Sequence, residues 1–247
     1  MKAMIFAAGL GTRLKPLTDK KPKALLAIGG KSMLEWTIQK LINNGFNEII
    51  INVHHFANQV TEFLNKKKNF RASITLSHEN GLLLDTGGGL KKASWFFNDS
   101  IPFLLHNVDV LSNINLKDLV SFHVAHDSVL ATLVVRNRQS SRYLLFDQDL
   151  ILSGWVNEAT GEEIITRNTG KKLQKFAFSG IQLISPELLS LIDLEGKFSI
   201  IDVYLRLSEQ HKIIAFPDNN SYWFDLGNAK KLYDAEKFML KNKIKHT

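Results

Sequence analysis

Short apolar segments alternate with amphipathic segments through the first half of this 247-residue chain. An apolar run that ends at glycine, as Ala3–Ala8 does before Gly9, is typical of a strand buried on both faces. Apolar residues that recur every three or four positions, as between Ser32 and Gly45, are typical of a helix with one buried face. The alternation predicts βαβ units with a mostly parallel sheet and helices on both of its faces.

The first half therefore divides into short buried strands and amphipathic helices. The expected strands are Ala3–Ala8, Glu48–Val53, Ser73–Ser77 and Pro102–His106. The expected helices are the segment from Ser32 to Gly45, Ala57–Lys67 and Gly87–Phe97. Ser32 with Glu35 three residues later predicts a capping box at the first of these helices.

The second half is less regular. Its expected strands are Val129–Val135, Tyr143–Phe146, Leu150–Leu152, Phe176–Ile184, Ile213–Phe216 and Tyr222–Asp225. Its expected helices are Pro186–Asp193, Ile200–Gln210 and a last one from about Asn228, and a polar stretch occupies Asn157–Lys172. No internal repeat or linker marks a boundary, so residues 1–247 are expected to form one three-layer, Rossmann-like α/β domain.

Composition narrows the classes of protein. The chain is 45% hydrophobic and 22% charged and has no cysteine, which excludes disulfides, thiolate metal sites and a cysteine nucleophile. No apolar run approaches the roughly 18 residues of a membrane helix, so we expect a cytoplasmic protein without a membrane partner.

The net charge of +7 suits anionic ligands. Lysine runs such as Lys66–Lys68 are typical of solvated helix ends. The aromatic residues do not alternate with basic ones as they do in proteins that bind single-stranded nucleic acid, so we expect no nucleic-acid partner. The histidines have no zinc-like spacing; His123 and His126 are expected on an exposed helix.

The loop after the first strand, Gly9-Leu10-Gly11-Thr12-Arg13, carries the strongest functional signal. Open α/β sheets bind ligands outside the carboxyl ends of their strands, and glycines there let backbone N–H groups approach phosphate oxygens. A dinucleotide fingerprint fails, because Leu14 replaces its third glycine and Pro16 interrupts the following helix. A P-loop that ends at Gly30-Lys31-Ser32 also fails, because Leu25 stands where its first glycine is needed.

A third pattern fits at nearly every fixed position. Ala7-Ala8-Gly9-Leu10-Gly11-Thr12-Arg13-Leu14-Lys15-Pro16-Leu17-Thr18, followed by Pro22-Lys23-Ala24-Leu25-Leu26, resembles the signature of the sugar-1-phosphate nucleotidyltransferases. The resemblance spans about residues 1–240 and is weakest over 136–175. It implies Mg²⁺-dependent transfer of a nucleoside monophosphate from an NTP to a sugar-1-phosphate, with release of pyrophosphate. The chain ends after one expected final helix, so we expect no C-terminal β-helix domain such as some relatives carry.

Both substrates are anions, so catalysis must align and neutralise negative charge. The planar fork of Arg13 suits the leaving pyrophosphate, and Lys23 is a point charge suited to the α-phosphate or the sugar phosphate. The matching arginine and lysine of the family serve these roles. The predicted nucleotide contacts in the loop are Ala8, Gly9, Gly11 and Thr12.

Two aspartates are candidate Mg²⁺ ligands, because protein Mg²⁺ sites use one or two carboxylates and leave the rest to phosphates and waters. Asp109 directly follows a buried strand, and Asp225 lies in Trp223-Phe224-Asp225-Leu226-Gly227. Both resemble the metal-binding aspartates of the family. Val108 departs from the family's usual glycine, and a β-branched residue tolerates positive φ poorly.

Two further segments resemble those of N-acetylmuramate-1-phosphate uridylyltransferases: Asp85-Thr86-Gly87-Gly88-Gly89-Leu90 and Ala177-Phe178-Ser179-Gly180-Ile181. The resemblance implies that Thr86, Gly87 and Gly88 contact the base and that Asn107, Ser179 and Gly180 contact the sugar. The glycine run is also expected to permit close approach of a ligand. Sugar-binding elements are expected mainly within 136–227.

The sequence leaves the base and the sugar open. Uridylyl transfer to N-acetylmuramate-1-phosphate or a similar hexose-1-phosphate is the first interpretation, and guanylyl transfer to mannose- or heptose-1-phosphate is the alternative. A non-catalytic regulator that binds sugar nucleotides also remains open. Nothing in the sequence predicts the oligomeric state.

Overall fold

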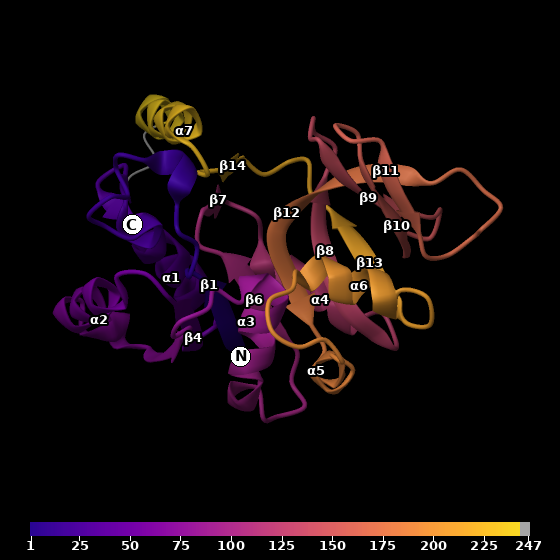
Figure 1. Ribbon diagram of the computed structural model, residues 1–247, viewed down its shortest axis with the longest axis horizontal. Helices are drawn as coiled ribbons and strands as arrows, with labels where there is room; N and C mark the ends of the chain where they lie inside the picture. The colour runs from indigo at the N-terminus through magenta and orange to yellow at the C-terminus, as the bar shows by residue number, and fades with distance from the viewer. Residues whose placement is uncertain (243–247) are drawn as a thin grey trace. The chain divides into compact units, whose positions relative to one another are not determined.

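The computed structural model describes residues 1–242, and the chain divides into two compact units. Unit 1 comprises residues 1–83, 106–113 and those from 222 on; unit 2 comprises residues 84–105 and 114–221. Both combine helices and strands, which confirms the α/β class (Figure 1). That residues 1–247 form a single domain stays a prediction. Within the described range no helix has the length and apolar character needed to cross a bilayer.

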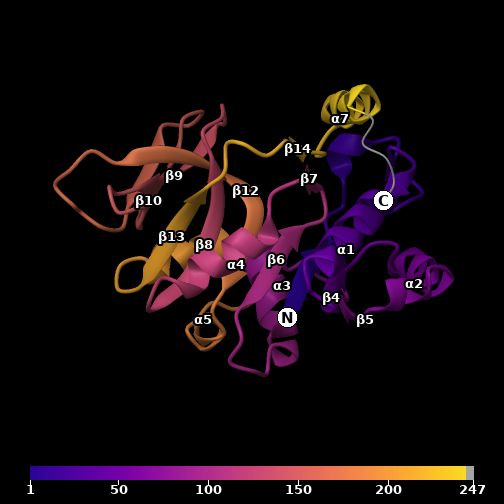
Figure 2. The same cartoon turned by 180° about the vertical axis from the view of Figure 1, so that it is seen from behind.

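Unit 1 is built on a parallel sheet of the predicted kind. Its strands are β1 (Lys2–Phe6), β4 (Glu48–Val53) and β5 (Ser73–His78), in the order β1-β4-β5. Lys2 to Phe6 pair in register with Glu48 to Asn52, and the central residues of both strands are fully buried. Figure 2 shows β4 and β5 side by side. Continuous burial explains why the central residues of β1 and β4 are all apolar, whereas β5, whose residues are mostly half-buried, alternates polar and apolar side chains.

Two helices connect these strands, as the sequence predicts. They are α1 (Met33–Asn43) and α2 (Ala57–Lys66). The Ser32 hydroxyl caps α1 by accepting from the Glu35 N–H at 3.1 Å, but the predicted capping box is incomplete. The Glu35 carboxylate instead accepts from Lys67 Nζ at 2.9 Å, because the long lysine side chain reaches the helix start.

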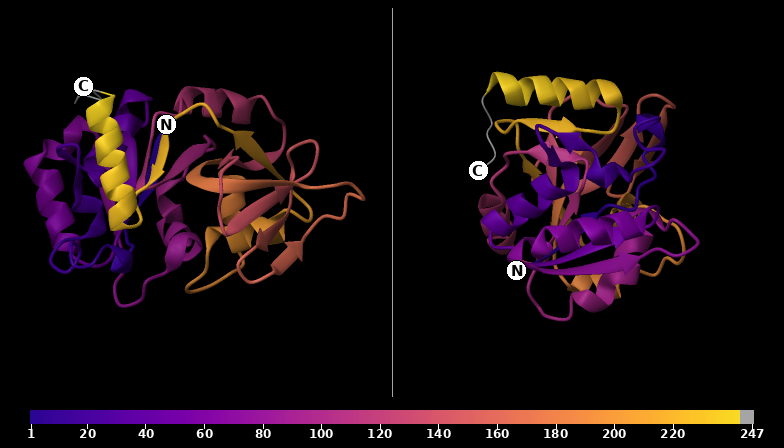
Figure 3. Two further views of the ribbon diagram at one scale, coloured as in Figure 1. Left: turned by 90° about the horizontal axis from the view of Figure 1, so that it is seen from above. Right: turned by 90° about the vertical axis from the view of Figure 1, so that its left-hand side faces the viewer.

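Shorter elements complete unit 1. They are the hairpin of β2 (Ala27–Ile28) and β3 (Lys31–Ser32), the antiparallel pair of β7 (Val110–Ser112) and β14 (Trp223–Asp225), and the last helix α7 (Ala229–Lys241). Figure 3 shows α7 next to β14, from which the chain enters it. The strand β7 was not predicted, because three residues are too few for a hydrophobic period.

Unit 2 is mixed rather than parallel. Its strands pair in the order β11-β10-β9-β12-β8-β13; β8 and β13 run parallel, and the other neighbours in this order run antiparallel. The strands are β8 (Val129–Arg136), β9 (Arg142–Phe146), β10 (Leu152–Asn157), β11 (Glu162–Ile165), β12 (Gln174–Ile184) and β13 (Lys212–Pro217). The eleven-residue β12 pairs with β9 through its first residues and with β8 through the remainder.

Two strand predictions in unit 2 were inaccurate. The strand expected at Leu150–Leu152 begins at its last residue and runs on to Asn157, after the turn over Gln148 and Asp149. The polar stretch from Asn157 contains β11, whose four residues are all exposed. An exposed strand has no apolar alternation, so its pairing with β10 leaves no hydrophobic signal.

The helices of unit 2 are α3 (Asp85–Ala93), α4 (Leu116–Val124), α5 (Glu187–Ser190) and α6 (Ile200–Leu207). His123 on α4 was expected to be exposed, and this was wrong. Its side chain is 4% exposed, with Nδ1 2.8 Å from Thr132 Oγ1 and Nε2 3.0 Å from Ser185 Oγ. The bonds to neighbouring elements explain why a polar side chain occupies a buried helix face.

Two buried histidines should make stability depend on pH. Burial, with the nearby charge of Lys40, lowers the pKa of His106 to about 3 against the opposing bond to the Asn107 carbonyl. Burial, with the charge of His126, lowers the pKa of His123 to about 4. Both values lie below the unfolded value near 6.5, so acid protonates the unfolded chain first. For His106 alone we expect the free energy of unfolding to fall by about 2 kcal/mol between pH 6.5 and 5.

Urea unfolding of the wild type and of His106→Asn at pH 7 and pH 5 measures this effect. The variant should lose less stability on acidification than the wild type, whereas His55→Asn, at an exposed position, should follow the wild type. Equal losses in all three proteins would contradict the prediction.

Candidate active site

The loop after β1 is fixed by glycine and by contacts within unit 1. Gly11 has φ +64°, and a Cβ there would lie 2.9 Å from Thr18 Cγ2 and 3.1 Å from Lys23 Cβ. The Thr18 hydroxyl donates to the Gly11 carbonyl at 2.9 Å. Gly11 is therefore needed for both its backbone angle and the close approach of Lys23. Gly9, by contrast, is exposed, with open space where a Cβ would stand.

The two predicted metal ligands lie beside one another in unit 1. Asp225 ends β14, whose pairing with β7 sets it opposite Val110, the residue after Asp109. The Leu226 N–H donates to the Asp109 carbonyl at 2.8 Å. Residues separated by more than a hundred positions are thus joined by backbone hydrogen bonds, which hold both carboxylates at one site.

Arg13 and Lys23 lie at the same site. Lys23 Nζ donates to Asp109 Oδ2, and both side chains are largely withdrawn from solvent. Asp225 and Arg13 both lie against Gly227, since a Cβ on that glycine would lie 2.7 Å from Asp225 Oδ1 and 3.2 Å from Arg13 Nη2. The structure therefore brings together the four charged residues that the sequence singles out.

Lys231 is a member of this cluster that sequence analysis missed. Its Nζ donates to Asp225 Oδ2 from the first turn of α7, while Asn228 caps that helix by accepting from the Lys231 N–H at 2.9 Å. The only available signal was the capping Asn228 followed three residues later by lysine, and the sequence analysis gave Lys231 no role. The capped helix start directs Lys231 back toward Asp225.

The charges around Asp225 keep it ionised. Burial would raise the pKa of its carboxyl, but the hydrogen bond and charge of Lys231, the charge of Lys23 and the Gly227 N–H together hold it below its usual value. Each aspartate therefore carries an ammonium partner, Lys23 on Asp109 and Lys231 on Asp225. Two ionised carboxylates at one site supply the kind of oxygen ligands that Mg²⁺ takes from proteins, and the metal would replace the ammonium groups as their partner.

No group of three or more histidines, aspartates or glutamates within residues 1–242 is arranged to hold a metal ion. A Mg²⁺ site with two carboxylates does not need a third protein ligand, because phosphates and waters complete the octahedron around the ion.

The backbone conformation at Val108 explains why valine can stand where the family usually has glycine. Val108 is buried, and its N–H donates to the Phe6 carbonyl at 3.1 Å. Its φ is not positive, so the position does not require glycine. Asn107, a predicted sugar contact, ends β6 (Phe103–Asn107) and is half-buried, and its carbonyl accepts from His106 Nδ1 at 2.8 Å.

The predicted base-binding segment lies in unit 2, at the start of α3. The Gly87 N–H donates to the Phe198 carbonyl at 3.0 Å, and Thr86 Oγ1 accepts from the Ile200 N–H at 2.9 Å. A Cβ on Gly87 would lie 2.4 Å from the Phe198 ring, and one on Gly88 would lie 2.2 Å from the Gly196 carbonyl oxygen. Packing within unit 2 therefore explains why these two positions are glycine, which the sequence did not reveal. Their contact with a base stays a prediction.

We expect Gly88→Ala to destabilise the protein by about 1–3 kcal/mol, because the added methyl group must displace backbone at residue 196. Urea unfolding measures the change. Gly9→Ala is the matched control, because its Cβ meets nothing within 4 Å and stability should stay nearly unchanged. Equal stability of the two variants would contradict this account of Gly88.

The predicted sugar contacts of unit 2 lie in an irregularity of β12. The register between β12 and β8 shifts between Phe178 and Gln182, and Gly180 within this segment has φ +75°. Ser179 is buried and Gly180 supplies the left-handed backbone of the bulge. Bulges redirect side chains and occur next to active sites more often than elsewhere in sheets.

The predicted site residues thus fall into two sets. Those in unit 1 are Ala8, Gly9, Gly11, Thr12, Arg13, Lys23, Asn107, Asp109 and Asp225. Those in unit 2 are Thr86, Gly87, Gly88, Ser179 and Gly180.

Comparison with known proteins identifies the family and agrees with the fold. A family model described as nucleotidyl transferase matches residues 2–242, and the chain belongs to that family. The chain is 30% identical over 232 residues to the mannose-1-phosphate guanyltransferase of Kluyveromyces lactis, across 93% of this chain and 62% of that protein. It is 33% identical over 233 residues to the mannose-1-phosphate guanylyltransferase catalytic subunit beta of Dictyostelium discoideum, with the same coverage. The chain therefore spans about three fifths of the length of these relatives.

Solved structures share the fold. A UDP-glucose pyrophosphorylase complexed with UDP-glucose superposes with a TM-score of 0.80 at 16% identity, covering 98% of this chain and 99% of that one. HddC from Yersinia pseudotuberculosis complexed with GMP-PN gives 0.74 at 22% identity, covering 96% and 99%. The family prediction is confirmed. The named relatives differ from the uridylyltransferases that the Asp85–Leu90 segment resembles.

Proposed function

We propose that this chain transfers a nucleoside monophosphate from an NTP to a sugar-1-phosphate and releases pyrophosphate. The observation that carries the proposal is the cluster of Arg13, Lys23, Asp109 and Asp225 beside the glycine loop. Two cations and two carboxylates at one site match a reaction between two anions that needs a bound divalent cation.

In the proposed reaction an oxygen of the sugar phosphate attacks the α-phosphorus of the NTP. The bond between that phosphorus and the bridging oxygen of pyrophosphate breaks, and its electron pair leaves with pyrophosphate. The attacking phosphate is already ionised at neutral pH, so no general base is required. Mg²⁺ held by Asp109 and Asp225 would neutralise charge on the phosphates during this transfer.

The residues of the loop bind and orient the nucleotide. Backbone N–H groups from Ala8 to Thr12 hold the triphosphate, and the guanidinium of Arg13 binds the departing β- and γ-phosphates. Lys23 exchanges Asp109 for the α-phosphate or the sugar phosphate. Thr86 to Gly88 contact the base, and Asn107, Ser179 and Gly180 contact the sugar.

Two substrate pairs each have an observation in their favour. The names of the relatives favour GTP with mannose-1-phosphate. The segments Asp85–Leu90 and Ala177–Ile181 favour UTP with N-acetylmuramate-1-phosphate and thus a role in cell-wall precursor metabolism in the cytoplasm.

A screen of four NTPs against a panel of sugar-1-phosphates, with Mg²⁺ and a pyrophosphate-coupled readout, tests the proposal. One productive pair should release pyrophosphate in proportion to the NDP-sugar formed. A protein that binds NDP-sugars by calorimetry but releases no pyrophosphate from any pair would be a regulator, and the proposal would be wrong.

A further inference from the structure

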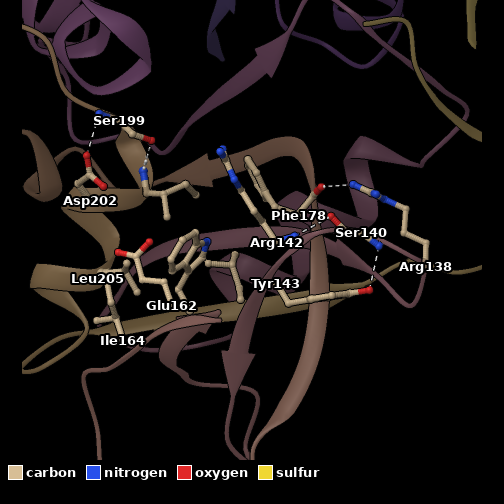
Figure 4. Close-up of a pocket in the computed structure, with 13 residues that line it drawn as sticks. Arg138, Ser140, Arg142, Tyr143, Glu162, Ile164, Phe178, Ser199, Asp202 and Leu205 are labelled. Atoms are coloured by element: carbon tan, nitrogen blue, oxygen red, sulfur yellow. Dashed lines mark hydrogen bonds between the residues drawn. The ribbon is translucent and has the colours of Figure 1, made fainter. Parts of the chain in front are cut away.

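The proposed function leaves a pocket in unit 2 and a buried pair of polar side chains in unit 1 without a role. The pocket has a volume of about 440 Å³ and is lined mainly by β9, β10, β11, the middle of β12 and the start of α6. The hydrogen bonds drawn in Figure 4 join its lining residues to one another, as where Arg138 donates to the Phe178 carbonyl at 3.0 Å. These bonds stabilise the walls of the pocket itself. The pair in unit 1, Asn52 and Glu79, instead reaches the backbone of the loop that follows β1.

Asn52 and Glu79 lie at the carboxyl ends of two neighbouring parallel strands. Asn52 is near the end of β4, and Glu79 directly follows β5. Their side chains are withdrawn from solvent, with 2% and 3% of each residue exposed. Asn52 Nδ2 donates to Glu79 Oε1 at 2.6 Å, and Asn52 Oδ1 accepts from the Ala7 N–H at 2.7 Å. The amide of Asn52 thus joins a buried carboxyl group to the first residue after β1.

These partners leave the Asn52 amide a single orientation. The Ala7 N–H can only donate, so the oxygen of the amide must face it and the nitrogen must face Glu79. The backbone of Glu79 is held in turn, because its carbonyl accepts from His54 Nδ1 at 2.6 Å and its N–H donates to the Val53 carbonyl at 2.8 Å. The pair is therefore a fixed acceptor for the Ala7 N–H.

The peptide unit between Phe6 and Ala7 is held from both sides. Its N–H donates to Asn52, and its carbonyl accepts from the Val108 N–H at 3.1 Å. Val108 directly precedes Asp109, a proposed metal ligand. This peptide therefore ties the start of the glycine loop to the backbone that carries Asp109.

The glycine loop is thus anchored at two points with a free residue between them. Ala7 is held by Asn52, and Gly11 is held by its contacts with Thr18 and Lys23. Gly9, between these anchors, has open space where a Cβ would stand. Without a side chain at Gly9 to pack against the protein, the course of the loop depends on the direction in which the chain leaves Ala7.

Stability alone does not explain a buried amide and carboxyl group at these positions. Three isoleucines precede Asn52 in β4, so the surrounding strand is apolar. Moving polar groups from water into the interior costs free energy that their hydrogen bonds offset only in part, and well-packed apolar side chains are often at least as stabilising. Buried polar networks do make their surroundings rigid. The pair is therefore better explained by the geometry that it imposes on the loop.

We propose that Asn52 and Glu79 are positioning residues for the nucleotide, which fix the peptide before Ala7 and thereby the direction of the N–H groups of the glycine loop. The inference rests on the proposed function, in which these N–H groups hold the triphosphate. Displacing a bound reactant by about 1 Å can slow a reaction on the order of 100-fold, so the orientation of a single peptide at the loop start matters for the transfer.

Asn52→Leu tests the proposal, because leucine has a similar size but neither accepts from the Ala7 N–H nor donates to Glu79. With the full chain and the productive pair of substrates, we expect KM for the NTP to rise about 10-fold and KM for the sugar-1-phosphate to stay within about twofold. Calorimetric binding of the NTP with Mg²⁺ and without sugar should weaken by a similar factor. A merely structural role would reduce the folded fraction, and hence the apparent kcat, at unchanged KM.

Thr37→Val is the matched control in unit 1. Thr37 is 2% exposed, and its hydroxyl donates to the Met33 carbonyl within α1 at 3.0 Å. The variant removes one buried hydrogen bond without touching the Ala7 N–H. Urea unfolding should show a loss of stability, whereas KM for the NTP should stay at the wild-type value.

Reversing the bond between the two side chains gives a test that does not depend on Asn52→Leu being folded. Asn52→Asp sets a second carboxyl group against Glu79 and removes the donor, so KM for the NTP should rise about 10-fold. Glu79→Gln keeps an acceptor for Asn52 Nδ2 and should stay within about threefold of wild type. In the double variant the glutamine amide donates to the introduced carboxylate, which still accepts from the Ala7 N–H. KM for the NTP should therefore return to within about threefold of wild type.

Recovery in the double variant supports the inference. An unchanged KM for the NTP in Asn52→Asp, or a double variant no better than Asn52→Asp alone, overturns it while pyrophosphate release by the wild type upholds the proposed function. Absence of pyrophosphate release by the wild type from every pair overturns the proposed function. Calorimetric binding of the NTP to the same four proteins then decides about Asn52 and Glu79 separately.

Discussion

Replacing Asp225 with asparagine is expected to lower kcat/KM for pyrophosphate release by about 10³-fold. Asparagine keeps the shape of the side chain and the acceptor for the Gly227 N–H, which lies 2.9 Å from Asp225 Oδ1. It removes the negative charge that Lys231 and the proposed Mg²⁺ both require. Asp225→Ala, which also removes the acceptor, should be at least as inactive.

The measurement is pyrophosphate release over a range of Mg²⁺ concentrations. Half-saturation should move to higher Mg²⁺ in Asp225→Asn, because one of two carboxylate ligands has lost its charge. Asp234→Asn is the matched control, because Asp234 is exposed on the same helix as Lys231. Wild-type activity in Asp225→Asn, with an unchanged unfolding midpoint, would remove Asp225 from the metal site.

Three residues of the charged cluster were predictable because each stands at a point where a hydrophobic pattern ends. Asp109 follows an apolar run, Asp225 closes another, and Arg13 lies in the glycine loop after a third. Parallel strands of an α/β sheet present their carboxyl ends at one edge, whereas Asp225 reaches the site through the antiparallel pairing of β14 with β7. Sequence patterning therefore predicted which residues gather, although it did not reveal the contact between Lys23 and Asp109.

The other features could not be predicted from the sequence, because they depend on contacts between residues that are far apart along the chain. Lys231 is recruited by the direction in which Asn228 starts α7, and Gly88 is required by the carbonyl of a residue more than a hundred positions away. The strand β11 is held by pairing with β10 and buries none of its residues. The segment 136–175 contributes Arg142 and Trp155 to the pocket of unit 2, yet it has no motif. Pairing and packing leave no periodic signal in a single sequence.

Replacing Lys23 with methionine is expected to reduce kcat by about 10²- to 10³-fold. Methionine approximates the length of the lysine stem, so the packing of Gly11 against Lys23 Cβ is retained while the ammonium is lost. If Lys23 stabilises charge that develops at the α-phosphate, kcat falls at constant KM. If it holds the sugar phosphate equally in ground and transition states, KM for the sugar-1-phosphate rises instead.

Steady-state kinetics with each substrate varied in turn separate these cases, and Lys21→Met, at an exposed position two residues away, is the control. Values of kcat and KM within twofold of wild type would exclude Lys23 from catalysis. The contact with Asp109 makes the result informative about the metal as well. Mg²⁺ held by Asp109 would neutralise the carboxylate in place of Lys23, which would leave the ammonium of Lys23 available to the phosphates. Lys23→Met should therefore bind Mg²⁺ without nucleotide at least as tightly as the wild type, whereas Asp225→Asn should bind it more weakly.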